Sequence, residues 1–166
     1  MSRVNRAARA PTGAEETGAA PPTEVVAGVI IRDRRVLICQ RRAGGHHPGK
    51  WEFAGGKVEP HEGLEAALRR ELQEELGIDA TIGALLWRTT HQYPGGEPFV
   101  LSFFEVERYT GVLSNRQFAA LRWAQLGTLA GIDFLAADRE FVTQLEAGGL
   151  EMLRKTRHAG ERCRRR

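Results

Sequence analysis

Three glutamates on one short stretch of the chain are the residues best suited to chemistry. Glu71, Glu74 and Glu75 are spaced i, i+3 and i+4, so their side chains share one face of a helix. Carboxylate oxygens are the ligands that Mg²⁺ and other hard cations prefer. A divalent cation neutralises the charge of a pyrophosphate linkage, which otherwise repels an attacking water, and it acidifies that water. The cluster therefore indicates metal-assisted attack on a phosphate anhydride.

Neighbouring residues favour a metal site over a merely solvated acidic surface. Three glutamates alone would favour the solvated alternative, in which they pair with Arg69 and Arg70 in water. Gly56 and Glu62, at fixed offsets before the cluster, reverse that preference. Glycines at 55 and 56 let the backbone come close to an ion and offer it a carbonyl. Arg70 can also orient a glutamate through a bidentate contact.

The hydrophobic pattern predicts the element that carries the glutamates. Leucines recur every four residues from Leu64 to Leu76, which predicts a helix over 63–76 with the leucines buried. The glutamates then lie beside that stripe, within about 100° of arc, and face the cleft made by the preceding loop. Gly77 is the expected C-terminal stop of the helix.

Strands and one further helix complete the predicted domain. Val25–Ile31 and Val36–Gln40 predict a hairpin around a charged turn. Further strands are predicted at 51–53, 78–91, 99–106 and 121–126, and a second helix at 138–147. Strands mixed with two helices predict an α/β layered domain with a mixed sheet.

Composition indicates a soluble globular protein. The chain has 166 residues, 42% of them hydrophobic and 27% charged, which suits one domain with tails. The longest apolar runs are far too short to cross a bilayer, so no membrane partner is expected. The two cysteines, Cys39 and Cys163, give neither a disulfide framework nor a metal-binding spacing. That usage fits a reducing cytoplasm.

The two ends of the chain differ from the middle in composition. Residues 1–23 are rich in Ala, Pro, Thr and Gly and contain no secretory apolar segment, so we expect a disordered leader. Seven Lys or Arg and one Glu lie within 154–166, and we expect 148–166 to form a solvated basic tail. Nucleic-acid contact by this tail is the less favoured alternative. The folded domain is expected at 24–147.

The segment around the glutamates resembles a known motif. Residues 56–78, GKVEPHEGLEAALRRELQEELGI, match every fixed position of the Nudix box, GX5EX7REUXEEXGU, where U is a bulky aliphatic residue. The likeness extends over 24–147 and is strongest to the MutT-type branch. That branch hydrolyses nucleoside triphosphates to the monophosphate and pyrophosphate. Ala54 and His91-Gln92 resemble the matching residues of bacterial CTP pyrophosphohydrolases. Those enzymes also act on oxidised nucleotides, as 8-oxo-dGTP diphosphatases do.

The resemblance implies a fold, a metal site and catalytic residues. The fold would be the Nudix fold, a mixed β-sheet sandwiched between helices (α/β/α). The carbonyl of Gly55 with Glu71, Glu74 and Glu75 would hold Mg²⁺, or Mn²⁺ in its place. Arg70 would brace the cluster, and Glu62 would shape the segment that leads into the helix.

The resemblance also implies contacts with a nucleoside triphosphate substrate. Arg42 and Lys57 would contact the phosphates or another part of the substrate. Phe53 is the best candidate to stack on the base. Asp138 takes the position that reads the base, and a carboxylate there favours a base with an exocyclic amine, such as cytosine. The alternative for Asp138, equally natural by position, is to cap the last helix.

One departure from the family pattern bears on the catalytic base. Gln117 stands where relatives commonly have a glutamate, and no other acid lies between Glu107 and Asp133. An amide is a poor proton acceptor, so either Glu74 or Glu75 supplies the base, or turnover is slow.

Three functions are compatible with these features. The first is nucleoside triphosphate hydrolysis that cleans the nucleotide pool in the cytoplasm, by a monomer or homodimer. The second is hydrolysis of another diphosphate, such as a dinucleoside polyphosphate or nucleotide sugar. The third is a nucleotide-binding sensor with little turnover. The sequence names neither the base nor the sugar.

Overall fold

The computed structural model describes residues 21–148. Its strands are β1 (Thr23–Val29), β2 (Ile31–Arg32), β3 (Arg35–Gln40), β4 (Trp51–Glu52), β5 (Gly55–Lys57), β6 (Asp79–His91), β7 (Phe99–Thr110) and β8 (Ala120–Gln125). Its helical elements are α1 (Leu64–Leu76), the 3₁₀ turn η1 (Leu129–Gly131) and a C-terminal helix over 139–148. The predicted basic tail and all but the last residues of the predicted leader lie outside the described residues.

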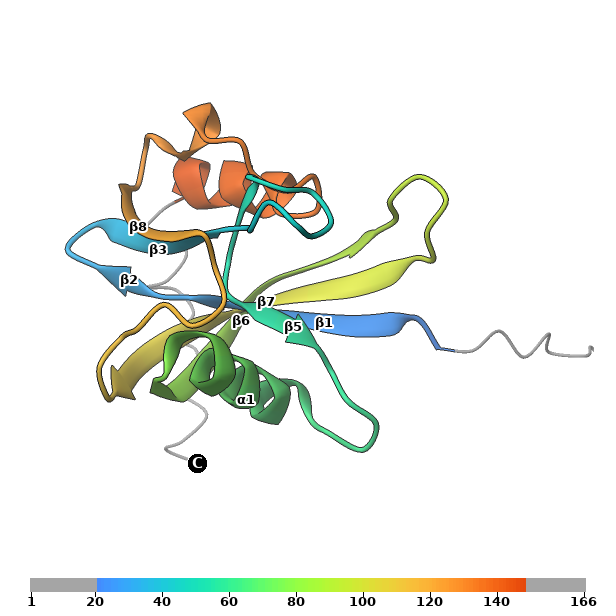
Figure 1. Ribbon diagram of the computed structural model, residues 1–166, viewed down its shortest axis with the longest axis horizontal. Coiled ribbons are helices and arrows are strands. Elements are labelled where there is room, and N and C mark those ends of the chain that lie inside the picture. The colour runs from blue at the N-terminus through green and yellow to red at the C-terminus, as the bar shows by residue number, and fades with distance from the viewer. Residues whose placement is uncertain (1–20, 149–166) are drawn as a thin grey trace, which may run out of the picture.

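The strands form two sheets, and the chain passes from one sheet to the other between β1 and β2 (Figure 1). The larger sheet has the order β5-β1-β7-β6, in which β1 and β7 are parallel and the other neighbours are antiparallel. In the smaller sheet β3 pairs with β2, β4 and β8, all antiparallel. The predicted α/β class with a mixed sheet is therefore confirmed.

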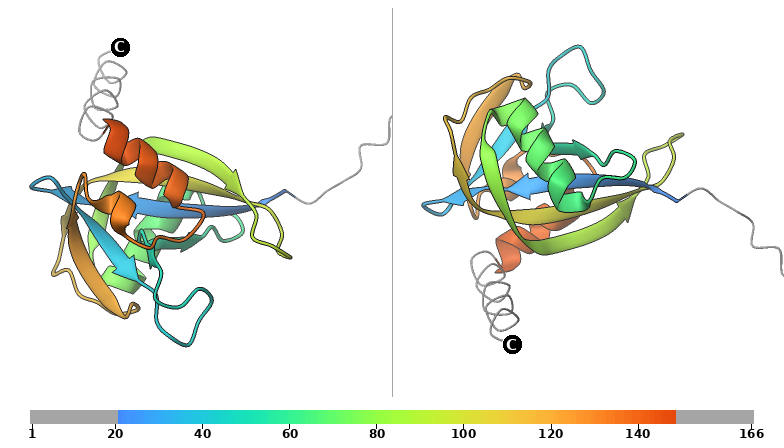
Figure 2. Two further views of the ribbon diagram at one scale, coloured as in Figure 1. Left: turned by 90° about the horizontal axis from the view of Figure 1, so that it is seen from above. Right: turned by 90° about the horizontal axis from the view of Figure 1, so that it is seen from below.

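Helices cover both faces of the larger sheet, as the two views of Figure 2 show. Side chains alternate along β7: Leu101 and Phe103 pack on one face, and Phe104 and Val106 on the other. The first face packs against the C-terminal helix through Phe141, and the second packs against α1. The predicted arrangement of a sheet between helices is confirmed. No helix in the described range is long and apolar enough to span a membrane.

Helix α1 forms where the leucine pattern predicts it. Leu68, Leu72 and Leu76 are fully buried, and Leu64 packs at the edge of the same cluster. The helix ends at Gly77, whose φ of 70° is the left-handed conformation of a C-terminal stop. The helix is thus fixed through its leucine stripe, which leaves its acidic face free to line a site.

Two short segments with unusual backbone angles shape the sheets. The predicted hairpin turns at Asp33 and Arg34, whose φ values of 50° and 59° are those of a type I′ turn. Strand β5, which the sequence did not predict, pairs with β1 through Gly55 and Lys57. A side chain at Gly55 would overlap the carbonyl of Val26, so only glycine allows this pairing. Strand β5 carries the chain from the sheet to α1.

Replacing Gly77 by alanine should destabilise the fold more than replacing a glycine of similar φ in open space. A Cβ at Gly77 would lie 2.7 Å from side-chain atoms of Ser114 and Arg116, whereas one at Gly95, with a φ of 75°, meets nothing within 4 Å. We expect G95A to lower the free energy of unfolding by about 1 kcal/mol and G77A by about 2 kcal/mol or more. Denaturant unfolding of both variants measures this, and equal losses would contradict it.

Candidate active site

The guanidinium of Arg70 ties the acidic face of α1 to the segment that precedes it. Its Nε and Nη2 donate to the two carboxylate oxygens of Glu62 at 3.1 and 2.9 Å, and its Nη1 donates to Glu71 at 2.9 Å. Glu74 lies 3.7 Å from the same Nη1. The hydrogen bonds from Arg70 lower the pKa of Glu62. The bidentate contact is therefore made with Glu62, while Glu71 receives one hydrogen bond.

Strand β5 lies directly against this acidic face. The amide of Gly55 donates to Oε2 of Glu75 at 3.0 Å. A Cβ on Gly56 would overlap the present position of the Glu71 carboxylate, so glycine leaves room for that side chain. The two glycines thus bring the backbone next to two of the predicted metal ligands.

Ionisation of Glu75 is unfavourable in this setting, because the Gly55 amide compensates the negative charge only in part. Burial raises the pKa of Glu75 to about 8, against the hydrogen bond from Gly55, and the charges of Glu71, Glu52 and Glu74 raise it further. A bound cation would relieve this repulsion, and the donors present are all oxygens, which suit a hard divalent cation. The residues therefore fit such an ion.

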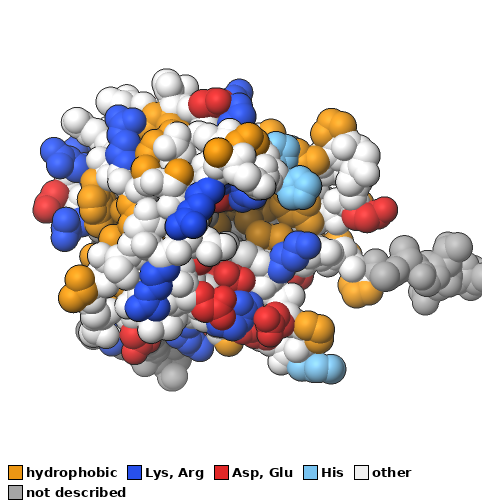
Figure 3. All heavy atoms as spheres, viewed as in Figure 1, with side chains coloured by type: hydrophobic (Ala, Val, Ile, Leu, Met, Phe, Trp, Pro, Cys, Tyr) orange, Lys and Arg blue, Asp and Glu red, His pale blue; other side chains and the backbone are white. Residues whose placement is uncertain are grey.

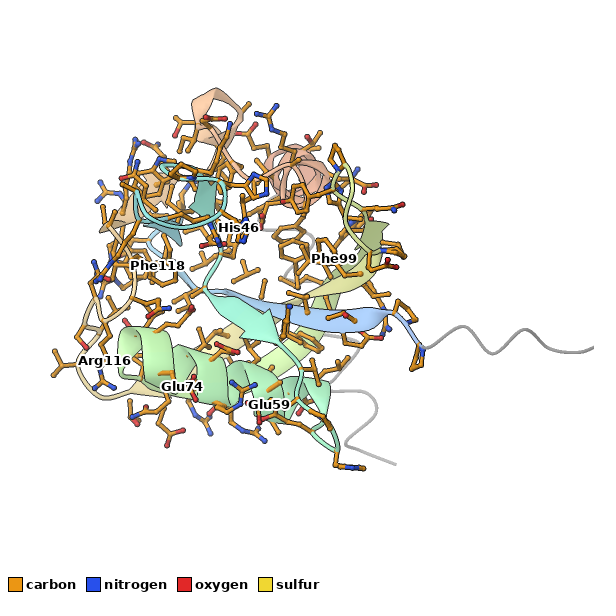
Figure 4. All side chains as sticks on the ribbon, turned by 45° about the vertical axis from the view of Figure 1, so that its right-hand side comes forward. His46, Glu59, Glu74, Phe99, Arg116 and Phe118 are labelled. Carbon is orange, nitrogen blue, oxygen red and sulfur yellow. The ribbon has the colours of Figure 1, made fainter. Side chains whose placement is uncertain are left out.

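The three glutamates share a face but do not meet at one point. Within residues 21–148 no three Asp, Glu, His or Cys side chains converge as metal ligands would. Glu71 and Glu74 turn toward Arg70, while Glu75 accepts from Gly55. Figure 4 shows Glu74 on the open side of α1. Ligation by Glu71, Glu74, Glu75 and the Gly55 carbonyl stays a prediction.

A cleft of about 400 Å³ opens beside the acidic face, and Figure 3 shows it as an apolar hollow next to clustered acidic and basic side chains. We call it the apolar cleft. Its apolar wall includes Phe53, Tyr93, Phe99, Leu101, Leu135 and Ala137, and its polar wall includes Arg41, Glu52, Gly55, Gly56, Lys57 and Asp138. Its size and lining suit a flat organic ring with a few polar atoms.

A second cleft of about 280 Å³ lies beside Glu75 on the acidic face of α1. We call it the polar cleft; it is lined by Arg41, Arg42, Gly45, Glu52, Glu75, Gln117 and Phe118. Arg42 donates from Nε to the carbonyl of Phe118 at 3.4 Å. In Figure 4, Phe118 and Arg116 lie on the loop that passes the end of α1. Gln117 of this loop therefore lies in the same cleft as Glu75.

Asp138 both begins the C-terminal helix and faces the apolar cleft. Its carbonyl accepts from the amide of Val142 at 2.9 Å, as an N-cap residue's does, while its side chain lines the cleft. The residue is 4% exposed. Burial raises the pKa of Asp138 well above its usual range, and the charge of Glu52 adds to the rise, against the backbone of Phe53 and the charge of Arg41. Asp138 thus begins the last helix through its backbone, and its contact with a base stays a prediction.

The other predicted substrate residues divide between the clefts. Lys57 lies at the apolar cleft and Arg42 at the polar cleft. Phe53 lines the apolar cleft but is only 4% exposed, because its ring packs against Phe103, Phe134 and Phe141. Most of the ring therefore belongs to the core.

Sequence reasoning missed the ion pair between Arg41 and Glu52. Arg41 Nη1 lies 3.1 and 2.9 Å from the two carboxylate oxygens of Glu52, and both residues line both clefts. Burial raises the pKa of Glu52, and Arg41 opposes that rise. A signal was present, because an acid within the otherwise apolar run 51–54 needs a cationic partner when it is buried.

Comparisons with known proteins agree with this geometry. The chain is 46% identical over 101 residues to the CTP pyrophosphohydrolase of Escherichia coli, covering 60% of this chain and 73% of that protein. It is 44% identical to the 8-oxo-dGTP diphosphatase of Proteus vulgaris, covering 56% of this chain and 83% of that protein. The solution structure of the E. coli ORF135 protein superposes with a TM-score of 0.72 at 36% identity, covering 81% of this chain and 95% of that one.

The sequence profile of the family matches most of the chain. The profile described as the NUDIX domain matches residues 22–145, which include both sheets, α1 and both clefts. The chain therefore belongs to the Nudix hydrolase family.

Proposed function

We propose that this protein hydrolyses nucleoside triphosphates to the monophosphate and pyrophosphate in the presence of Mg²⁺, and so cleans or balances the cytoplasmic nucleotide pool. The observation that carries the proposal is the meeting of two clefts at one ion pair: an apolar cleft sized for a base and a polar cleft beside the acidic face of α1. The E. coli and Proteus relatives, by their names, act on CTP and 8-oxo-dGTP. Both names support a nucleoside triphosphate substrate.

The metal site is assigned to the acidic face of α1. Nudix hydrolases generally use a divalent metal. We assign the ligands to the Gly55 carbonyl with Glu71, Glu74 and Glu75, and the metal to Mg²⁺, for which Mn²⁺ can substitute. A bound divalent cation supplies charge neutralisation on the phosphates and a more acidic water. Few protein ligands are needed, because Mg²⁺ keeps several of its own waters.

The chain's own residues position the phosphates and accept a proton. Arg42 and Arg41 border the polar cleft, and Lys57 borders the apolar cleft, so cations flank the path of a triphosphate. Glu74 or Glu75 accepts the proton of the attacking water, since Gln117 is a poor proton acceptor. Arg70 holds Glu62 and Glu71 and thereby sets the position of the acidic face.

The base is assigned to the apolar cleft. Phe53 offers the part of its ring that remains accessible, and Asp138 accepts a hydrogen bond from an exocyclic amine. A carboxyl group keeps an accepting oxygen in either protonation state, so the raised pKa of Asp138 is compatible with this role. An amine-bearing base such as cytosine is therefore the proposed preference.

Two other functions are separated from this one by their products. A dinucleoside polyphosphate or nucleotide sugar would be cut without release of free pyrophosphate. A low-turnover sensor is the alternative that Gln117 suggests. It would bind the nucleotide and release little monophosphate or pyrophosphate. The folded catalytic unit is proposed as residues 24–147, acting as a monomer or homodimer.

A panel of triphosphates tests the substrate. We expect Mg²⁺-dependent release of pyrophosphate, with a higher kcat/KM for cytidine-type than for guanine-type substrates because Asp138 accepts from the cytosine amine. Normal and oxidised triphosphates should be compared under one condition. A strong preference for 8-oxo-dGTP would contradict the role given to Asp138.

Neutralising Glu74 should remove turnover while leaving the fold intact. Glu74 is exposed on α1, so E74Q costs little stability, but it removes a proposed ligand or base. We expect kcat to fall by at least about a hundredfold, more than the loss of a supporting residue costs. The matched control is E65Q, which removes an exposed carboxylate from the first turn of the same helix. Unchanged turnover in E74Q would exclude this role.

Neutralising Asp138 should stabilise the protein at neutral pH. Because the folded-state pKa of Asp138 is raised, the folded state loses stability relative to the unfolded state as pH rises from the ordinary aspartate range. We therefore expect D138N to exceed the wild type in unfolding free energy at pH 7, with a difference that shrinks as pH falls toward 4.

An aspartate nearby provides a control of opposite sign. Lys50 lowers the pKa of Asp133, so D133N should lose stability at neutral pH, and that loss should disappear as pH falls through the lowered pKa. Denaturant unfolding across pH measures both variants. A D138N curve that follows the D133N curve would show that Asp138 is stabilised in its charged form instead.

A further inference from the structure

The hydroxyl of Tyr93 is buried in the apolar cleft without a hydrogen-bond partner among residues 21–148. The backbone of Ala137 lies beside it without meeting hydrogen-bond geometry. Three other buried atoms in that range also lack partners, on Glu24, Trp87 and Ser102, and none of these residues lines either cleft. A buried hydroxyl without a partner is unfavourable, and phenylalanine would avoid the cost. The partner is therefore expected to arrive with a ligand.

Neighbouring rings fix the direction of this hydroxyl. Tyr93 follows β6, and its ring centroid lies 4.5 Å from that of His47, 4.6 Å from that of His91 and 6.0 Å from that of Phe99. His47 belongs to the loop after β3, whereas His91 ends β6 and Phe99 begins β7. Because rings from this loop and from both strands pack around the phenol, its hydroxyl oxygen is positioned before a ligand binds.

The hydroxyl stays a donor at physiological pH. Burial raises the pKa of Tyr93, and the charges of Asp138 and Glu52 raise it further, against the backbone of Ala137 and the charge of Arg41. The phenol is thus protonated and offers its hydrogen. Asp138 lines the same cleft and offers an accepting oxygen. The cleft is therefore lined by both a donor and an acceptor.

We propose that Tyr93 contributes to base recognition by donating a hydrogen bond to ring N3 of a cytosine whose exocyclic amine donates to Asp138. This inference rests on the proposed function and names its substrate class. Cytosine carries an amine next to a ring nitrogen without hydrogen. On uracil a carbonyl replaces the amine that would donate to Asp138, and the neighbouring ring nitrogen carries a hydrogen, so it cannot accept from Tyr93.

Substitution on both the protein and the nucleotide tests this bond. The probes are CTP and 3-deazacytidine triphosphate, in which a C–H replaces N3 and the amine is kept. Wild type should lose about tenfold in kcat/KM on passing from CTP to the deaza compound, the order expected for one hydrogen bond. Y93F should lose a similar factor on CTP but make no distinction between the two nucleotides, because the same bond is already absent.

The control is Y109F, which removes the other tyrosine hydroxyl of the chain on β7, outside both clefts. It should discriminate as the wild type does. If Y93F lowers both rates equally and keeps the wild-type ratio, Tyr93 acts only through packing and the inference is overturned.

Failure of the proposed function is recognised separately. A wild-type protein that releases no pyrophosphate from any triphosphate would overturn that function. Calorimetric binding of CMP and 3-deaza-CMP without turnover would still report on Tyr93. Loss of the CMP preference in Y93F supports the bond, and a preference absent from the wild type contradicts it.

Discussion

The close approach of strand β5 to helix α1 is the constraint on which the rest of the site depends. The amide of Gly55 donates a hydrogen bond to the carboxylate of Glu75, and Gly56 leaves room for the carboxylate of Glu71. Because β5 also pairs with β1 in the larger sheet, the acidic face of α1 is held against the sheet on one side. The buried leucine stripe packs the helix against the same sheet, so the carboxylates are placed by backbone and core together.

The ion pair of Arg41 and Glu52 forms the boundary between the two clefts. A buried charge is tolerated when it is paired with good geometry, and here Nη1 of Arg41 donates to both carboxylate oxygens of Glu52. Both residues lie where β3 ends and β4 pairs with it, so the sheet fixes their positions. A nucleotide with its base in one cleft and its phosphates in the other must cross this pair. The boundary therefore offers a cation to the phosphates without leaving Glu52 unpaired in the free protein.

Features that depend on neighbours within one helical turn could be predicted from the sequence. The span of α1, its end at Gly77 and the shared face of its glutamates follow from periodicity alone. Strand β5 could not be predicted, because Gly-Gly-Lys has little strand propensity and its pairing with β1 joins residues about thirty positions apart. For the same reason, no local pattern shows that Arg41 pairs with Glu52 while Arg42 donates to the carbonyl of Phe118. Their arrangement is set by the contact between strands.

Burial of acidic groups gives the site its electrostatic character. Burial is the largest cause of the raised pKa at Glu75, at Glu52 and at Asp138. Glu75 lies on α1, Glu52 lies between the clefts and Asp138 lies in the apolar cleft. Where these three groups are ionised, a triphosphate without cations would meet like charge, and the repulsion is strong where water is excluded. Cations on the phosphates would remove that repulsion near α1. The base in the apolar cleft is neutral and therefore adds no charge there. These three acidic groups therefore favour a nucleotide whose phosphate end is charged and cation-bound and whose base end is neutral.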